Sequence, residues 1–181
     1  MRYSVEKLIK EQGHFLKEDF IFFWKIRKGR VINKSCFSQW YQSDFIIENR
    51  TYSCAEQYMM AQKALLFEDN RSFEQIMAAS DPKEIKSLGR GVKGFDPVKW
   101  EEEKYGIVRK GNFAKFTQRP ELRDFLLSTE GKILVEASPY DRIWGVGMGE
   151  SNEDIINPLK WRGQNLLGFI LMDIRDSIIE T

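Results

Sequence analysis

Two Asp-Pro pairs divide the middle of this 181-residue chain and restrict its possible folds more than any other feature. Aspartate is a favoured helix N-cap and proline is favoured in the first helical turn, so Asp81-Pro82 and Asp96-Pro97 each predict a helix start. Apolar residues at helical spacing extend this pattern on both sides. The predicted helices cover residues 53–66, 70–79, 82–89, 97–116, 120–127 and 166–179, with a shorter one near the N-terminus.

Strand signals lie on either side of this helical block. Aromatic and β-branched residues predict strands over residues 19–24 and 132–137, and a hairpin over 45–52 that turns at Asn49. Strands that gather before the helices and again near residue 135 are typical of an α+β fold, whereas a doubly wound sheet would alternate strand and helix. We expect a helix-rich single domain with a small sheet from the N-terminal strands and the strand near residue 135.

Composition narrows the class of protein further. The chain is 42% apolar and 13% aromatic, which is typical of a globular protein. We expect residues 1–18 to form a polar N-terminal extension and residues 19–181 to form the domain. The net charge of +1 disfavours a general nucleic-acid-binding protein. No apolar run approaches the ~20 residues of a membrane span, and no signal-peptide pattern opens the chain, so we expect a cytoplasmic protein.

The residues that could ligate a metal are few. Cys36, Cys54 and the single histidine, His14, do not suffice for a typical structural zinc site, and two cysteines do not make a disulfide scaffold. We therefore expect no metal and no cofactor.

The predicted helix over residues 53–66 carries two opposite charges on one face. Glu56 and Lys63 are two turns apart, so they are separated by about 10 Å along the helix axis, with apolar residues between them. This arrangement suits the wall of a pocket. Two structural alternatives remain open: Ser53-x-x-Glu56 is also a capping-box pattern, and Lys63 could reach solvent along its apolar stem.

Two glycine-bearing segments are further candidates. The loop over residues 141–149 contains Asp141 and Trp144; the indole could stack on a planar base, or Trp144 could fill the core while Asp141 forms a turn. The segment over residues 88–94 places Arg90 and Lys93 among three glycines. Such a segment suits phosphate, but it could equally be a solvated helix end.

Five motifs occur in an order that resembles the NADAR superfamily, also called YbiA-like, over roughly residues 20–178. They are Phe37-Ser-Gln-Trp40, Ser53-x-x-Glu56-Gln-Tyr-Met-x-x-x-Lys63-Ala64, Gly89-Arg-x-Val92, Trp144-Gly-x-Gly147 and Asn165-Leu-Leu-Gly168. The resemblance implies a compact α+β domain that cleaves N-glycosidic bonds at a ribose. It implies two substrate classes: early ribosyl-phosphate intermediates of riboflavin synthesis, and ADP-ribose attached to guanine, including ADP-ribosylated DNA. Gln57 stands where many relatives have histidine.

Within this resemblance, a carboxylate is needed to stabilise an oxocarbenium-like anomeric carbon and to activate water. Glu56 is the first candidate and Asp141 the second. Lys63 would pair with phosphate or carboxylate oxygens, or would attack the sugar as a nucleophile if burial lowers its pKa. Substrate binding falls to the remaining motif residues, namely Arg90 for phosphate, Trp144 for the base, and Trp40, Gly145, Gly147 and Asn165. The alternative function is a module that binds ADP-ribose or a nucleotide without hydrolysing it.

Overall fold

The computed structural model describes residues 2–11, 15–26 and 31–180. The chain divides into two compact units: the first consists of residues 1–38 and 121–181, and the second of residues 39–120. Helices predominate and the strands form small sheets, so the predicted α+β class is confirmed. His14 lies outside the described residues.

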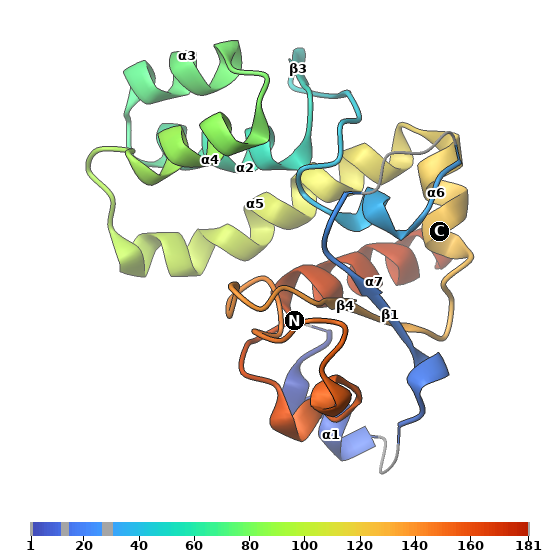
Figure 1. Ribbon diagram of the computed structural model, residues 1–181. Coiled ribbons are helices and arrows are strands. Elements are labelled where there is room, and N and C mark those ends of the chain that lie inside the picture. The colour runs from blue at the N-terminus through green and yellow to red at the C-terminus, as the bar shows by residue number, and fades with distance from the viewer. Residues whose placement is uncertain (1, 12–14, 27–30, 181) are drawn as a thin grey trace. The chain divides into compact units, whose positions relative to one another are not determined.

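The observed elements follow the predicted pattern closely (Figure 1). The helices are α1 (Val5–Glu11), α2 (Ala55–Leu66), α3 (Asn70–Ala78), α4 (Pro82–Arg90), α5 (Pro97–Thr117), α6 (Pro120–Leu127) and α7 (Leu166–Ile179). The strands are β1 (Phe20–Phe23), β2 (Phe45–Ile47), β3 (Arg50–Tyr52) and β4 (Ile133–Glu136). Both Asp-Pro pairs act as predicted: Asp81 and Asp96 accept hydrogen bonds from main-chain N–H groups of the first turns of α4 and α5. None of the described helices is long and apolar enough to cross a membrane.

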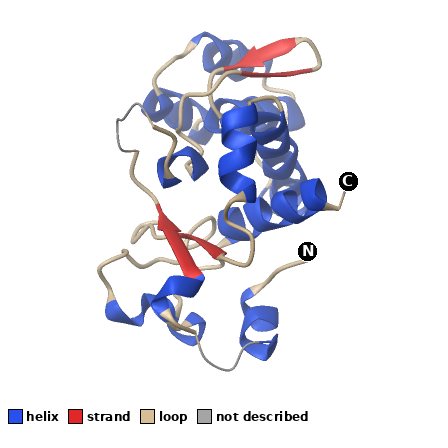
Figure 2. Cartoon of the chain, turned by 90° about the vertical axis from the view of Figure 1, so that its right-hand side faces the viewer, coloured by secondary structure: helices blue, strands red, loops and turns tan. Residues whose placement is uncertain are grey.

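The strands form two separate pairs, shown in red in Figure 2, instead of one small sheet. In the first unit, β1 and β4 are parallel, with Phe20 opposite Ile133. In the second unit, β2 and β3 form the predicted antiparallel hairpin. Its turn residues, Glu48 and Asn49, have φ values of 52° and 62°, which fits a type I′ turn.

A side chain occupies the outer edge of this hairpin. The N–H of Ile46 donates to Gln118 Oε1 at 2.8 Å, and Gln118 Nε2 donates to the carbonyl oxygen of Ile46 at 2.7 Å. The glutamine amide therefore takes the hydrogen bonds that a further strand would make. No further strand can use the main-chain groups of Ile46 at this edge of β2.

The core of the first unit is built where α7 packs on β4. A Cβ atom at Gly168 would lie 2.0 Å from the carbonyl oxygen of Leu134, so only glycine allows this close approach. Apolar residues of α7, including Leu167, Ile170 and Ile174, are fully buried. Gly168 therefore fixes α7 close to the strand that precedes the glycine-rich loop.

The second unit is arranged around α2, which packs against α3, α4 and α5. Residues 55–61 of α2 are all buried. Glycines allow the neighbouring helices to approach: a Cβ at Gly89 would lie 1.9 Å from the sulfur of Met60, and one at Gly111 would lie 2.5 Å from the ring of Tyr58. The helix predicted over residues 53–66, whose charged face had more than one interpretation, is thus α2, the central helix of the second unit.

The described part of the N-terminal segment packs within the first unit. The ring of Tyr3 stacks on Phe169 of α7, with centroids 6.5 Å apart, and the Tyr3 hydroxyl donates to the Asp176 carboxylate. Burial and this hydrogen bond raise the pKa of Tyr3 to about 12. Arg2 forms an ion pair with Glu180. The predicted domain boundary after residue 18 stays a prediction.

Candidate active site

Glu56 lies in the first turn of α2, two residues after the N-cap residue Cys54. The residue is only 2% exposed, and its main-chain N–H donates to the carbonyl oxygen of Gln39 at 2.9 Å. A carboxylate in the first turn interacts favourably with the helix dipole. The position therefore places a buried carboxyl group in the first turn of the central helix.

The capping-box alternative for Glu56 is wrong, because the neighbouring Gln57 takes that role. The N–H and the hydroxyl of Ser53 donate to Gln57 Oε1, at 2.8 and 3.1 Å. Gln57 Nε2 in turn donates to the carbonyl oxygens of Ile76 and Ala79, both at 3.0 Å. Gln57 thus joins the start of α2 to the end of α3.

Lys63 lies in the last turn of α2 and is half-buried. Its Nζ donates to the carbonyl oxygen of Gly89 at 2.9 Å and lies 4.3 Å from the ring centroid of Phe95 and 5.7 Å from that of Trp100. Burial lowers the pKa of Lys63. The alternative in which Lys63 simply reaches solvent is therefore wrong, and the lowered pKa meets the condition set for a nucleophilic role.

Arg90 is the last residue of α4 and is exposed. The preceding residue in the chain, Gly89, accepts the hydrogen bond from Lys63 Nζ through its carbonyl oxygen. Trp40 is half-buried in the same unit, with Lys86 Nζ 5.8 Å from its ring centroid. The second unit therefore contains four predicted site residues: Glu56, Lys63, Arg90 and Trp40.

In the first unit, Asp141 organises the glycine-rich loop that follows β4. Its Oδ1 accepts hydrogen bonds from the main-chain N–H groups of Ile143 and Trp144, at 2.9 and 2.8 Å. Its carbonyl oxygen accepts from the N–H of Gly147 at 2.9 Å. This geometry is that of a turn-forming aspartate, which was one of the two sequence interpretations. The catalytic role of Asp141 stays a prediction.

Gly145 and Gly147 serve the internal packing of the same loop. A Cβ at Gly145 would lie 2.7 Å from the carbonyl oxygen of Glu136, and Gly147 has a φ of +66°. Both positions therefore require glycine for the path of the backbone. Their predicted contact with substrate stays a prediction.

Asn165 supports this loop from the start of α7. It is fully buried, with a left-handed φ of 54°. Its Oδ1 accepts from the N–H of Glu136 at 3.0 Å, and its Nδ2 donates to the carbonyl oxygen of Leu134 at 2.9 Å. Its N–H donates to Gly145. These bonds to β4 give Asn165 a positioning role, and its predicted contact with substrate stays a prediction.

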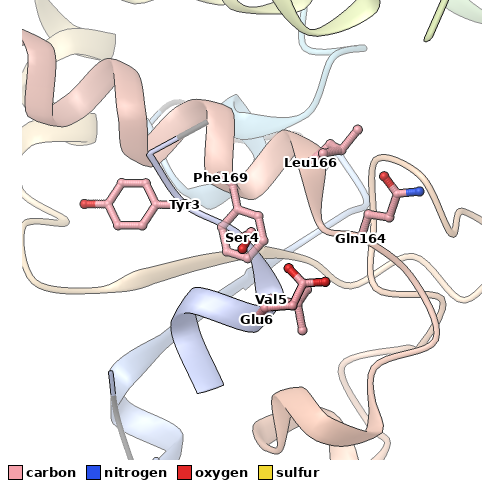
Figure 3. Close-up of a pocket in the computed structure, with 7 residues that line it drawn as sticks. All are labelled: Tyr3, Ser4, Val5, Glu6, Gln164, Leu166 and Phe169. Carbon is pink, nitrogen blue, oxygen red and sulfur yellow. The ribbon is translucent and has the colours of Figure 1, made fainter. Parts of the chain in front are cut away.

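The first unit thus contains Asp141, Trp144, Gly145, Gly147 and Asn165. The first unit also has a pocket of about 190 Å³ (Figure 3), which contains none of the predicted site residues. It is lined by Tyr3, Ser4, Val5, Glu6, Gln164, Leu166 and Phe169.

Sequence reasoning missed a group of buried polar residues around the start of α2. Gln39 is 7% exposed and Asn112 is fully buried, and Asn112 Nδ2 donates to Gln39 Oε1 at 2.7 Å. Lys115, one turn further along α5, is also fully buried. The sequence signal that could have revealed this group was Asn112, a polar residue within an otherwise apolar and aromatic stripe of its helix.

Comparison with known proteins identifies relatives of this chain. The chain is 44% identical over 164 residues to N-glycosidase R617 of Acanthamoeba polyphaga mimivirus, covering 88% of this chain and 96% of the relative. It is 33% identical to N-glycosidase YbiA of Escherichia coli over 132 residues, 73% of this chain and 74% of the relative. The NMR structure of E. coli YbiA superposes with a TM-score of 0.72 at 29% identity, covering 92% of this chain and 89% of that chain.

A third relative is the maize riboflavin biosynthesis protein PYRR, chloroplastic, with 33% identity over 138 residues, 72% of this chain but 20% of the relative. The relatives named N-glycosidase support one class of protein, a hydrolase that acts on N-glycosyl bonds. The NADAR domain model matches residues 22–179. The chain belongs to the NADAR family.

Proposed function

We propose that this N-glycosidase hydrolyses the ribose–nitrogen bond of a phosphorylated or ADP-ribosylated substrate, with Glu56 as the catalytic carboxylate. The observation that carries the proposal is the position of Glu56, buried in the first turn of the central helix α2, where the N–H of Ser53 donates to Gln57. A buried charged residue needs compensating interactions, so its retention at such a site suits a functional role.

Cleavage of a ribose–nitrogen bond develops positive charge at the anomeric carbon. The Glu56 carboxylate would stabilise this charge and would align a water molecule and accept its proton as the oxygen attacks. The nitrogen base leaves with the electron pair of the broken bond and takes a proton from solvent or a neighbouring acid. The products are the free base and the ribose with its hydroxyl at the anomeric carbon.

Binding would rest on phosphate and base. Lys63 Nζ donates to the carbonyl oxygen of Gly89, and Arg90 is the next residue in the chain, so these two residues would provide cations for phosphate or pyrophosphate oxygens. Trp144 would stack on the base. The lowered pKa of Lys63 also supports the second role considered for its amine, attack on the anomeric carbon or opened sugar. Phosphate binding stays our first assignment, and trapping with borohydride would detect a covalent imine.

The substrate belongs to one of two classes, and the similarity to the riboflavin biosynthesis protein PYRR supports the first. One class comprises early ribosyl-phosphate intermediates of riboflavin synthesis, and the other comprises ADP-ribose attached to guanine, including ADP-ribosylated DNA. A cytoplasmic location, expected from the sequence, stays part of this proposal.

Incubation with one substrate of each class tests the proposal, with released base and sugar identified by mass spectrometry. We expect one class to release both products, and Glu56→Gln to release neither. Binding of ADP-ribose or the ribosyl phosphate with no release of base by the wild-type protein would contradict hydrolysis and favour the non-catalytic binding module.

A further inference from the structure

The buried amide pair Gln39 and Asn112 leaves one donor and one acceptor unused. Asn112 Nδ2 donates to Gln39 Oε1 and to the carbonyl oxygen of Val108, at 2.7 and 2.9 Å. Gln39 Nε2 and Asn112 Oδ1 are both buried, and neither has a hydrogen-bond partner among residues 2–11, 15–26 and 31–180. Buried polar atoms without partners are uncommon and call for an explanation.

The identity of these two atoms follows from their neighbours. The carbonyl of Val108 requires a donor, so the Asn112 atom facing it is Nδ2. The same Nδ2 then requires an acceptor on Gln39, which must be Oε1. Reversing either amide would place two donors or two acceptors against each other. The unused atoms are therefore one N–H donor on Gln39 and one carbonyl acceptor on Asn112.

The main chain of Gln39 also contacts the main chain of the proposed catalytic residue. The carbonyl oxygen of Gln39 accepts the hydrogen bond from the N–H of Glu56 at 2.9 Å. A hydroxyl group can accept from one partner and donate to another, so it matches one N–H donor and one carbonyl acceptor. A charged phosphate or carboxylate would match only the donor.

We propose that Gln39 and Asn112 form a subsite for a sugar hydroxyl, and that its occupant is the 2-hydroxyl of the ribose. This hydroxyl is attached to the carbon next to the anomeric carbon at which Glu56 is proposed to act. The inference rests on the proposed function for the choice of a ribose ligand. Gln39 and Asn112 would then distinguish ribose from 2-deoxyribose.

Equilibrium binding by isothermal titration calorimetry tests the subsite without turnover. The ligands are ribose 5-phosphate and 2-deoxyribose 5-phosphate, which differ only in this hydroxyl. We expect wild-type protein to bind the ribose compound about tenfold more tightly, the range for hydrogen bonds to otherwise unsatisfied buried groups. Gln39→Met keeps the approximate side-chain size and removes the donor, so it should bind both sugars alike.

Two further variants separate the subsite from general stability. Asn112→Leu removes the acceptor and should also abolish the discrimination, and it carries the test if Gln39→Met does not fold. Gln57→Met is the matched control, since it removes a buried amide whose hydrogen bonds are all structural. It should lower the melting temperature and retain the preference for ribose 5-phosphate.

The inference is overturned if wild-type protein binds both sugars alike or binds neither. It is also overturned if a folded Gln39→Met protein keeps the wild-type preference. A wild-type protein that prefers the ribose compound, yet releases base from neither substrate class, would overturn the proposed hydrolysis and leave the hydroxyl subsite in place.

Discussion

The main-chain N–H of Glu56 lies 2.9 Å from the carbonyl oxygen of Gln39, to which it donates a hydrogen bond. This contact joins the first turn of α2 to the segment that precedes the β2–β3 hairpin. The side chain of Gln39 is held in turn by Asn112 of α5. The position of the proposed catalytic carboxylate is therefore fixed by three parts of the second unit.

Asp141→Asn should keep turnover close to that of the wild-type enzyme. The asparagine Oδ1 can still accept from the N–H groups of Ile143 and Trp144, so the turn persists. Asp141→Ala removes this acceptor and should lower the free energy of unfolding by about 1–3 kcal/mol. Steady-state kinetics and urea unfolding of both variants provide the measurement. A folded Asp141→Asn enzyme with a hundredfold lower rate would make Asp141 the catalytic carboxylate.

Gly168→Ala should destabilise the protein by about 1–3 kcal/mol, the usual cost of overpacking. The added methyl group would meet the carbonyl oxygen of Leu134, a backbone atom that cannot rotate away. Gly106→Ala is the matched control in α5, because nothing lies within 4 Å of its added Cβ. It should stabilise by about 0.5–1 kcal/mol through helix propensity. Equal unfolding midpoints for the two variants would contradict the close packing of α7 on β4.

Lys63 should lose its proton at a lower pH than an ordinary lysine. Burial disfavours the ammonium and lowers the pKa of Lys63 from 10.5. The folded state therefore binds fewer protons between the lowered pKa and 10.5, so stability relative to Lys63→Met should rise with pH across that window. NMR titration of isotope-labelled lysine gives the pKa directly. A midpoint at or above 10.5 would remove the support for a nucleophilic amine.

Arg90→Ala should weaken the binding of phosphorylated substrates by about 1.5–3 kcal/mol, the range for hydrogen bonds to charged groups. An unphosphorylated nucleoside should be almost unaffected, because it lacks the group that Arg90 is proposed to bind. The losses from removing the phosphate and from removing Arg90 should be strongly non-additive, since both delete one interaction. A cycle of kcat/KM values measures this. Simple addition of the two losses would place the phosphate elsewhere.

The sequence predicted the helices well because each has a local signal. Asp81-Pro82 and Asp96-Pro97 start α4 and α5 as expected, and Asn49 turns the hairpin with a positive φ. The separation of the strands into two pairs was not predictable in this way. Strand pairing depends on contacts between distant segments, such as the one between Ile46 and Gln118, which are 72 residues apart in the chain.

The candidate site was only partly predictable for the same reason. Glu56 and Lys63 were identified from spacing within one helix. The role of Gln57 was not visible there, because it depends on hydrogen bonds to the distant residues Ile76 and Ala79. Asn165 belongs to a family motif, yet its burial against β4 became visible only in three dimensions. Hydrogen bonds between distant segments leave little trace in local spacing.

The central claim is that Glu56 acts on the substrate and does not merely support its helix. Turnover by Glu56→Gln, measured as base released from the substrate that the wild-type enzyme cleaves, tests it most directly. Glutamine preserves the size of the side chain, so we expect an unchanged fold by circular dichroism. The rate should fall by about a hundredfold or more. Wild-type turnover by a folded Glu56→Gln protein would contradict the claim and return Glu56 to a structural role.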